Sequence, residues 1–290
     1  MKNNANLEHV ISKIGDLPAM PEAVGEVLRL TDDPQVGMVR VSEAIQQDPA
    51  LTAKILKVSN SPYYGMKQYV GTLKLALVIL GVREVRNIVL GVSVFDALHN
   101  DRTETLLTGQ FWTHSFTVAG LAKQLGLRLH LGLQGEDFIS GLLHDIGKMV
   151  MCRQLGGQYE TVFRASGGSS DALCAAERDA FGFNHAEAGA ALALYWNLPE
   201  TLADSLWLHH AQADADLSEA RDPKLASLIR VANRAAHDGI TTGAEYSCSA
   251  CGEESAWKFL DPQGTMPGIE QRSEFLSQFG EVFSVSTPMH

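Results

Sequence analysis

The sequence lacks any long hydrophobic run, and this absence excludes most membrane proteins. Its longest apolar runs, at residues 75–82 and 88–95, are about eight residues each. A helix that spans a membrane needs roughly 20 apolar residues. The opening residues also lack the apolar stretch of a signal peptide. We therefore expect a cytoplasmic protein that does not associate with a membrane.

Cysteine is scarce, which excludes a disulfide scaffold. The chain has 4 cysteines in 290 residues, and without an export signal this is typical of a reduced cytosolic protein. Cys152 and Cys174 lie in helical patterns and are predicted to be buried thiols. Cys248 and Cys251 form a single CxxC in a polar segment. A zinc site usually needs a second pair or nearby histidines, so an exposed loop is favoured over metal binding.

Basic residues are outnumbered by acidic ones. There are 23 Lys and Arg against 34 Asp and Glu, a formal net charge of −11. Residues 1–105 are nearly neutral, and the acidic excess lies in residues 106–290. Because nucleic-acid binding relies on clustered Lys and Arg, we expect no nucleic-acid partner. Four basic residues of the N-terminal part favour a solvated surface over a groove for a nucleotide or a protein. They are Lys54, Lys57, Arg83 and Arg86.

Helical periodicity is what the sequence does contain. Val85, Ile88, Val89, Val92 and Phe95 recur at spacings of three and four, as on one face of a helix. No segment shows the alternation of a strand or the turn signal of a β-hairpin. We therefore predict an all-α fold of about 12 to 15 helices.

Local signals predict where some of these helices begin. Pro49 suits a first helical turn. Asn184 with Glu187 three residues later is typical of a helix start, and so is Asp222 before Pro223.

Polar segments divide the chain into three predicted parts. The string HNDRTETLLTG at residues 99–109 interrupts the apolar stripes, and a second irregular stretch begins at residue 241. The parts are an N-terminal helical unit at 1–104, a larger helical unit at 105–240, and an irregular loop with C-terminal helices at 241–290.

The string most informative about chemistry is FISGLLHDIGK, residues 138–148. Here an apolar helix ends in His144 and Asp145. An imidazole and a carboxylate at the end of a buried helix are costly unless they meet a charge. A divalent metal supplies that charge, and this donor pair suits Fe, Mn, Zn or Ni. A His-Asp pair bonded to the backbone is the alternative interpretation of this string.

Further histidines extend the pattern. His114 lies on an apolar helical stripe, where an isolated His is usually a satisfied core residue. His185 opens a helix, and the helix dipole there favours the neutral imidazole that binds metal. His209 and His210 follow as a pair. Together with His144, these residues favour a shared site.

At this point the chain resembles the HD superfamily of metal-dependent phosphohydrolases, through His114 followed by His144 and Asp145. The resemblance implies a later Asp on another helix, and the matching helix LASLIRVANRAA carries Asn233 in its place.

The remaining histidines are similar to those of the two-metal branch of this superfamily. That branch includes the HD-GYP cyclic-dinucleotide phosphodiesterases, and the match is to His185, His209 and His210. The GYP signature that follows the paired histidines in that branch is missing here.

The N-terminal half resembles the HDOD domain. The strings are LPAMPEAVGEVLRLTDDP, AIQQDPALTAKILKVSNSPYYG and TLKLALVILGVREVRNIVL. The resemblance covers roughly residues 10–240 and implies an all-α bacterial signalling or regulatory module. Within it, Asn60 is interpreted as ending a helix and bonding to the last turn.

The resemblance also bears on three residues around the site. Asn233 leaves one carboxylate against a dication, so we expect weaker metal binding. His237, one turn further along, is an exposed helix-end residue in the favoured interpretation and an assisting ligand in the other. Lys148 contacts a phosphate if the family motif holds, or forms a salt bridge at a helix end.

We therefore predict a helical N-terminal subdomain packed on an HD-like helical bundle. The predicted function is a regulatory signal-transduction module that binds a partner protein or a small nucleotide-like ligand without robust catalysis. The alternative is a metal-dependent phosphohydrolase acting on a nucleotide or cyclic dinucleotide. A divalent transition metal, weakly held, is the expected cofactor. Its predicted ligands are His114, His144, Asp145, His185, His209, His210 and Asn233.

Overall fold

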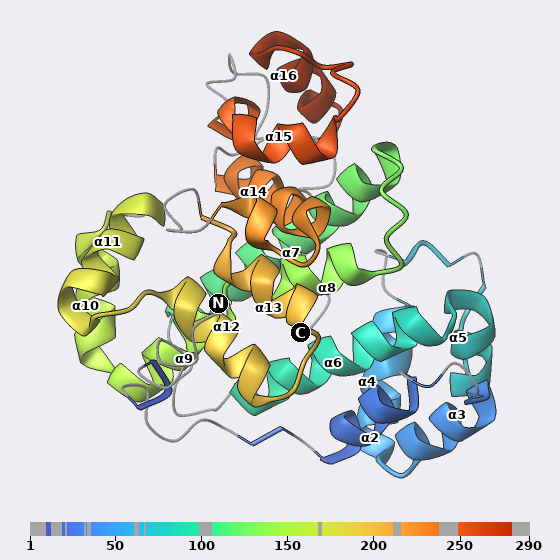
Figure 1. Ribbon diagram of the computed structural model, residues 1–290. Coiled ribbons are helices and arrows are strands. Elements are labelled where there is room, and N and C mark those ends of the chain that lie inside the picture. Colours follow the sequence, from blue (N-terminus) through green and yellow to red (C-terminus); the bar gives the residue numbers. More distant parts are fainter. Residues whose placement is uncertain are drawn as a thin grey trace. The chain divides into compact units, whose positions relative to one another are not determined.

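The computed structural model describes most of the chain and confirms the all-α prediction. The described residues are 10–12, 19–20, 22–31, 33, 36–60, 64–66, 68–98, 106–167, 170–210, 216–237 and 249–279. In these ranges the chain forms α-helices and short 3₁₀-helices and no strand (Figure 1). The described helices fall into two compact units, α2 to α6 and α7 to α16.

The N-terminal unit is built around its longest helix, α6. Its helices are α2 (Glu22–Thr31), α3 (Met38–Gln46), α4 (Pro49–Ser59), α5 (Leu73–Leu80) and α6 (Val82–Leu98). Helix α6 packs against α2, α4 and α5. It buries Val85, Ile88, Val89 and Val92 of the predicted stripe.

Asn60 ends helix α4, as the sequence predicted. Its side-chain amide donates to the carbonyls of Leu56 at 2.7 Å and Val70 at 2.9 Å. Its Oδ1 accepts from the backbone N–H of Val70 at 2.7 Å.

The basic residue Lys54, which was predicted to lie on a solvated surface, pairs with Asp96 at 2.5 Å on the exposed surface.

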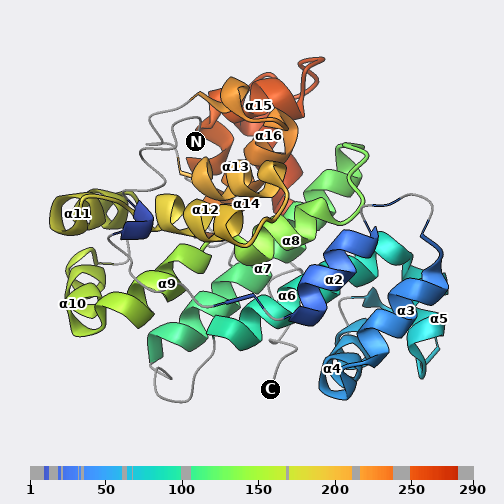
Figure 2. The same ribbon diagram turned by 60° about the horizontal axis from the view of Figure 1, so that its bottom comes forward.

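The second unit holds the predicted histidines. Its α-helices are α7 (Leu106–Arg128), α8 (Glu136–Leu143), α9 (Ile146–Leu155), α10 (Gly157–Ala165), α11 (Ser170–Phe181), α12 (His185–Tyr195), α13 (Glu200–Trp207), α14 (Pro223–His237), α15 (Glu254–Leu260) and α16 (Ile269–Ser277). The 3₁₀-helices are η2 (Leu217–Glu219) and η3 (Ser249–Gly252). Helix α7 packs against α8 and α14, and α12 packs against α9 and α13 (Figure 2).

One hydrophobic core joins α7, α14 and the C-terminal helices. Val118 and Leu125 of α7, Leu228 of α14, Trp257 of α15 and Leu276 of α16 are all buried in it. Helices α15 and α16 therefore share their core with the helices that carry the histidines.

The sequence analysis placed Cys248 and Cys251 in an exposed loop, and this prediction is wrong for Cys251. This residue is fully buried in η3 and is disulfide-bonded. It is buried because η3 packs against Trp257, whose indole N–H donates to the carbonyl of Ala250 at 2.9 Å. Cys248 lies outside the described residues. Cys174 is buried as predicted, whereas Cys152 is only half-buried.

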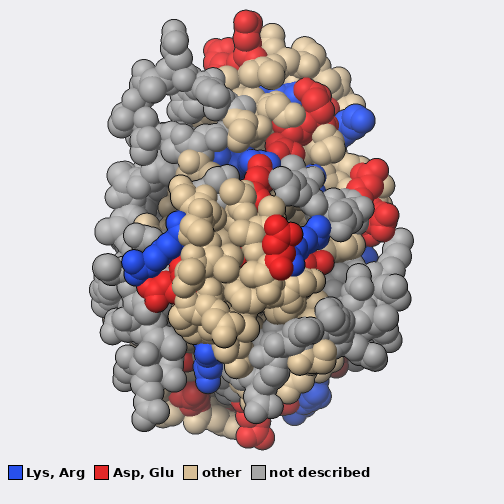
Figure 3. All heavy atoms as spheres, turned by 90° about the vertical axis from the view of Figure 1, so that its left-hand side faces the viewer, with Lys and Arg blue, Asp and Glu red and all other residues tan. Residues whose placement is uncertain are grey.

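The surface and helix lengths give two further observations. No helix in the described part of the chain is long and apolar enough to cross a membrane. On the side where α10 and α11 lie, Lys and Arg are interspersed with Asp and Glu around an area of uncharged residues (Figure 3). The absence of a nucleic-acid partner stays a prediction.

Candidate metal centre

The junction of α8 and α9 places the central carboxylate. His144 is the C-cap residue of α8, and Asp145 is the N-cap residue of α9. Gly141 allows this junction to lie close to α7, since a Cβ there would come within 2.7 Å of the Ala119 Cα. His114 of α7 places its Nε2 3.8 Å from the Asp145 Oδ2.

The start of α12 brings in the next histidine. Asn184 forms a capping box with Glu187, as predicted, so that α12 begins at His185. Gly147 of α9 permits a close crossing, because a Cβ at this position would lie 1.8 Å from the His185 carbonyl oxygen. His185 is thereby held beside Asp145.

The paired histidines come from the end of α13. This helix ends at Trp207 with Leu208 as its C-cap residue, and His209 and His210 follow directly. The buried Arg230 of α14 donates its Nε hydrogen to the Leu208 carbonyl at 2.9 Å. Helix α14 therefore fixes the turn that carries the pair.

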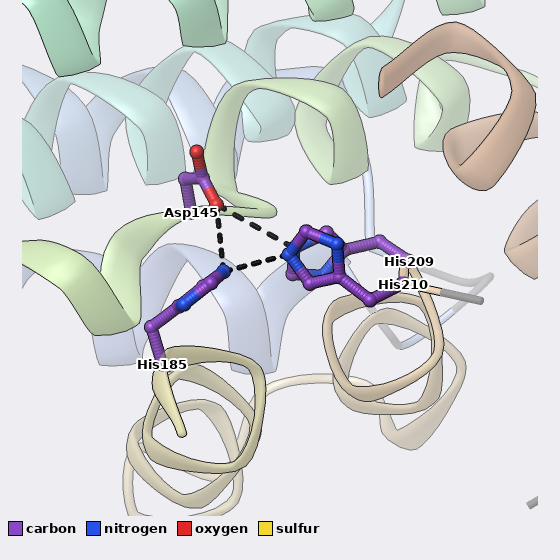
Figure 4. Close-up of side chains that lie close together, drawn as sticks. All are labelled: Asp145, His185, His209 and His210. Atoms are coloured by element: carbon purple, nitrogen blue, oxygen red, sulfur yellow. Dashed lines mark hydrogen bonds and ion pairs between the residues drawn. The ribbon is translucent and has the colours of Figure 1, made fainter. Parts of the chain in front are cut away.

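Asp145 lies between two sets of side chains, and we call the first set the inner group. The inner group contains Asp145, His185, His209 and His210 (Figure 4). The Asp145 Oδ1 lies 3.4 Å from the His185 Nε2 and 3.5 Å from the His209 Nε2. The Nε2 atoms of His185 and His210 are 2.7 Å apart. All four residues are buried.

We call the second set, around the Asp145 Oδ2, the outer group. It contains His114, His144 and Asn233 together with Asp145. The Oδ2 lies 3.3 Å from the His144 Nε2 and 3.8 Å from the His114 Nε2. The His114 Nε2 in turn lies 2.9 Å from the Asn233 Oδ1. The His114 side chain is 19% exposed, so the outer group reaches the surface.

Lys148 belongs to this second set by contact. Its ammonium is buried and donates to the Asp145 Oδ2 at 2.6 Å. The salt-bridge interpretation of Lys148 is therefore the one that the contact supports.

Hydrogen bonds at the Nδ1 atoms, on the side of each ring away from Asp145, orient three of the histidines. The Nδ1 atoms of His144 and His209 face the carbonyl oxygens of Gly141 at 2.7 Å and Leu206 at 2.5 Å. Those oxygens only accept hydrogen bonds, so each Nδ1 carries a hydrogen, and in the neutral ring the Nε2 presents a lone pair to the site. His185 is held in the same way by a carboxylate that the sequence analysis did not single out.

Several inward-facing atoms lack a hydrogen-bond partner among the described residues. They are the Nε2 atoms of His144 and His209 and the Oδ1 of Asp145. Buried polar atoms without partners are rare and call for an explanation such as an ion. A tetrahedral ion with bonds of about 2.1 Å places its ligand atoms about 3.4 Å apart. The 3.4 and 3.5 Å separations from Asp145 match this spacing, so Asp145, His185 and His209 fit a metal ion. The 2.7 Å between the Nε2 atoms of His185 and His210 is a hydrogen-bond distance, so His210 would have to move slightly to become a fourth ligand.

The protonation states also suit a metal site. Burial lowers the pKa of His209 to about 3 and lowers the pKa values of His210 and His114 well below normal. Burial alone would raise the pKa of Asp145, but His144 and Lys148 outweigh it and hold that pKa well below its usual range. The imidazoles of His209, His210 and His114 are therefore neutral and the Asp145 carboxyl is ionised, the forms that bind metal.

His237, at the end of α14, has the exposed helix-end position that the sequence analysis favoured, and its role as an assisting ligand stays a prediction. Its ring also lies against that of His114, with centroids 4.3 Å apart. It lies next to the outer group, at the surface end.

Sequence reasoning missed Glu177, the carboxylate behind His185. Glu177 is fully buried in α11, on the same face as Leu173 and Cys174. The available signal was its position four and three residues after these two apolar residues, since a helical face repeats at those spacings.

Comparison with known proteins gives a family and a fold. The HDOD domain family matches residues 17–212 of this chain. An uncharacterized protein of Treponema pallidum (strain Nichols) is 28% identical over 202 residues, which are 69% of this chain. The match spans only 39% of the length of that relative.

Two solved structures share the fold. A candidate phosphohydrolase from Shewanella amazonensis SB2B is 25% identical with a TM-score of 0.72, covering 97% of this chain and 98% of that one. A candidate signal transduction protein from Marinobacter aquaeolei VT8 is 19% identical with a TM-score of 0.73, covering 97% of this chain and 64% of that one.

Proposed function

The chain belongs to the HDOD family, and we propose that it is a regulatory module that binds a partner protein or a small nucleotide-like ligand. In this proposal the inner group holds one divalent transition-metal ion, and the protein has no robust turnover. The ion serves to fix the helices that carry its ligands.

The number of donors in the inner group carries this proposal. Three imidazole nitrogens and one carboxylate oxygen lie close together there, which are enough donors for a four-coordinate shell. Structural metal sites are closed in this way, whereas catalytic sites keep a position open for water or substrate. A metal held by the inner group would serve as a structural cross-link.

The outer group supports the same conclusion by its charge. The Asp145 Oδ2 already accepts from the Lys148 ammonium at 2.6 Å. Asn233 adds a neutral amide where the HD pattern has a carboxylate. A second dication would therefore meet an ammonium and too little negative charge, so two-metal chemistry is disfavoured.

An exposed apolar face supports a protein partner. Leu75, Val78 and Ile79 lie at spacings of three and four on α5 and are 38%, 62% and 48% exposed. Contiguous exposed apolar residues are typical of interaction surfaces. The similarity in fold to a candidate signal transduction protein agrees with this role.

A metal-dependent phosphohydrolase is the second candidate. It is favoured by the exposure of His114 at the rim of the outer group and by the unpartnered Nε2 of His144. The similarity to a candidate phosphohydrolase points the same way. A nucleotide bound at this rim would contact the outer group first.

Elemental analysis and a turnover assay separate the two candidates. Protein purified without chelator is expected to contain about one metal ion per chain. It should show no robust hydrolysis of nucleotides or cyclic dinucleotides with added Mn²⁺ or Fe²⁺. Two ions per chain, with turnover near one per second that Asp145→Ala abolishes, would establish the phosphohydrolase instead.

A further inference from the structure

The buried carboxylate of Glu177 makes three hydrogen bonds at the back of the inner group. Its Oε2 accepts from the backbone N–H of His185 at 2.8 Å and lies 2.6 Å from the His185 Nδ1. Its Oε1 accepts from the Tyr159 hydroxyl at 2.8 Å. Glu177 and Tyr159 are both fully buried. The contact therefore connects α10 and α11 to the first residue of α12.

This contact determines which His185 nitrogen faces the centre. An ionised carboxylate only accepts hydrogen bonds, so the His185 Nδ1 must carry the hydrogen. The Nε2 is then the lone-pair nitrogen, and it points at Asp145 and His210. With the opposite tautomer, the Nε2 would carry a hydrogen into the inner group and could not ligate an ion.

The charge of Glu177 also bears on the ion. The Asp145 carboxylate is already paired with the Lys148 ammonium, so these two groups cancel. Asn233 adds no charge. Glu177 is then the carboxylate that compensates for the one missing at Asn233. Its negative charge acts on the ion through its hydrogen bond to the His185 ring. A carboxylate behind a ligating imidazole raises its basicity toward the metal.

We propose that Glu177 is a positioning residue that fixes the His185 tautomer and strengthens the hold of the inner group on its ion. The inference rests on the proposed ion site. Tyr159 orients the other carboxylate oxygen and has a smaller effect. Neither residue belongs to the inner group.

Nitrogen chemical shifts of the histidines test the tautomer without any metal. In the wild-type protein with chelator, ¹⁵N–¹H spectra are expected to show His185 with hydrogen on Nδ1. In Glu177→Gln the amide can donate as well as accept, so the Nε2–H form should appear. A wild-type His185 that carries its hydrogen on Nε2 would overturn the proposal, whatever the stability of the variant.

Calorimetric titration with Zn²⁺ tests the affinity. Glu177→Gln is expected to weaken binding by roughly 10- to 100-fold, whereas the matched variant Tyr159→Phe, which keeps the carboxylate, should weaken it less. Equal affinity in wild type and Glu177→Gln would refute the positioning role. If the wild type itself binds no ion while its His185 has hydrogen on Nδ1, the proposed ion site fails and the tautomer assignment stands.

Discussion

Asn233 is the residue at which this site departs most from the HD pattern. It is buried, and its Oδ1 lies 2.9 Å from the His114 Nε2. We predict that Asn233→Asp lowers the melting temperature in chelator, because a second buried carboxylate is added near Asp145. With Mn²⁺ the same variant should gain more stability than the wild type. Thermal melts with and without metal measure both effects.

The matched control for that substitution is Asn197→Asp. Asn197 is exposed and has a positive φ of 53°, which Asn and Asp both tolerate. It undergoes the same change of charge away from the histidines, so its response to metal should equal that of the wild type. An Asn233→Asp protein that behaves like this control would show that no ion reaches the outer group.

His209 makes the stability of the metal-free protein depend on pH. Its pKa is about 3 in the folded state because of burial, against about 6.5 in an unfolded chain. Between these values the unfolded chain binds a proton that the folded chain does not, so the free energy of unfolding falls as the pH falls. Each such histidine contributes up to about 1.4 kcal/mol per pH unit.

Urea unfolding in chelator at pH 7, 6 and 5 measures this slope. The midpoint is expected to fall at each step, and His209→Gln should flatten the slope because it removes one titrating group. His210, whose pKa burial also lowers, would keep part of the slope. A midpoint independent of pH in the wild type would contradict the prediction.

Single residues were predictable where a motif carries them and unpredictable where only packing does. His144 and Asp145 were identified because they interrupt an apolar helix. Glu177 was not, because a glutamate on a helix is normally solvated. Its spacing from Leu173 and Cys174 places it on a buried face, but no local pattern encodes its contact with His185, eight residues further along.

At the scale of elements, the crossing of α9 and α12 depends on a glycine. A Cβ at Gly147 would lie 1.8 Å from the His185 carbonyl oxygen and 2.7 Å from the Gly189 nitrogen. Because backbone atoms cannot yield as a flexible side chain can, Gly147→Ala must push the helices apart. We predict a loss of about 1–3 kcal/mol in the free energy of unfolding and weaker metal binding, measured by urea unfolding and Zn²⁺ titration.

Gly157→Ala provides the control for this substitution. Gly157 is exposed at the start of α10, and a Cβ there would meet nothing within 4 Å. Alanine should be neutral or slightly stabilising at such a position, since it restricts the unfolded chain. Equal stability of the two variants would show that the helices are not in close contact at Gly147.

The starts of individual helices were well predicted from sequence because local chemistry sets them. The Asn184 capping box and the Pro49 start of α4 both form as expected. The crossings were not predictable. They depend on Gly141 and Gly147, and a glycine inside a helical pattern does not show which helix approaches it.

At the scale of the whole molecule, convergence of the histidines is the result of long-range packing. His114 and Asn233 are 119 residues apart in sequence and 2.9 Å apart in space. The family resemblance predicted that they meet, whereas periodicity alone predicted only that their helices bury one face. Asymmetry between the inner and outer groups could not be predicted, because it depends on which Asp145 oxygen each histidine faces.

Removal of the ion should therefore loosen the second unit as a whole, because the inner group joins the starts of α9 and α12 to the end of α13. Since only the folded chain presents these ligands together, binding must raise stability. At about 100 times the dissociation constant the gain is roughly 2.7 kcal/mol. His209→Ala, which deletes an inner ligand, should abolish the gain, whereas His144→Ala, which deletes an outer one, should leave most of it. Thermal melts of the three proteins with EDTA and with Zn²⁺ distinguish these outcomes. Equal losses in both variants would mean that the ion bridges the two groups, and an unchanged wild-type melting temperature would mean that the ion does not contribute to the fold.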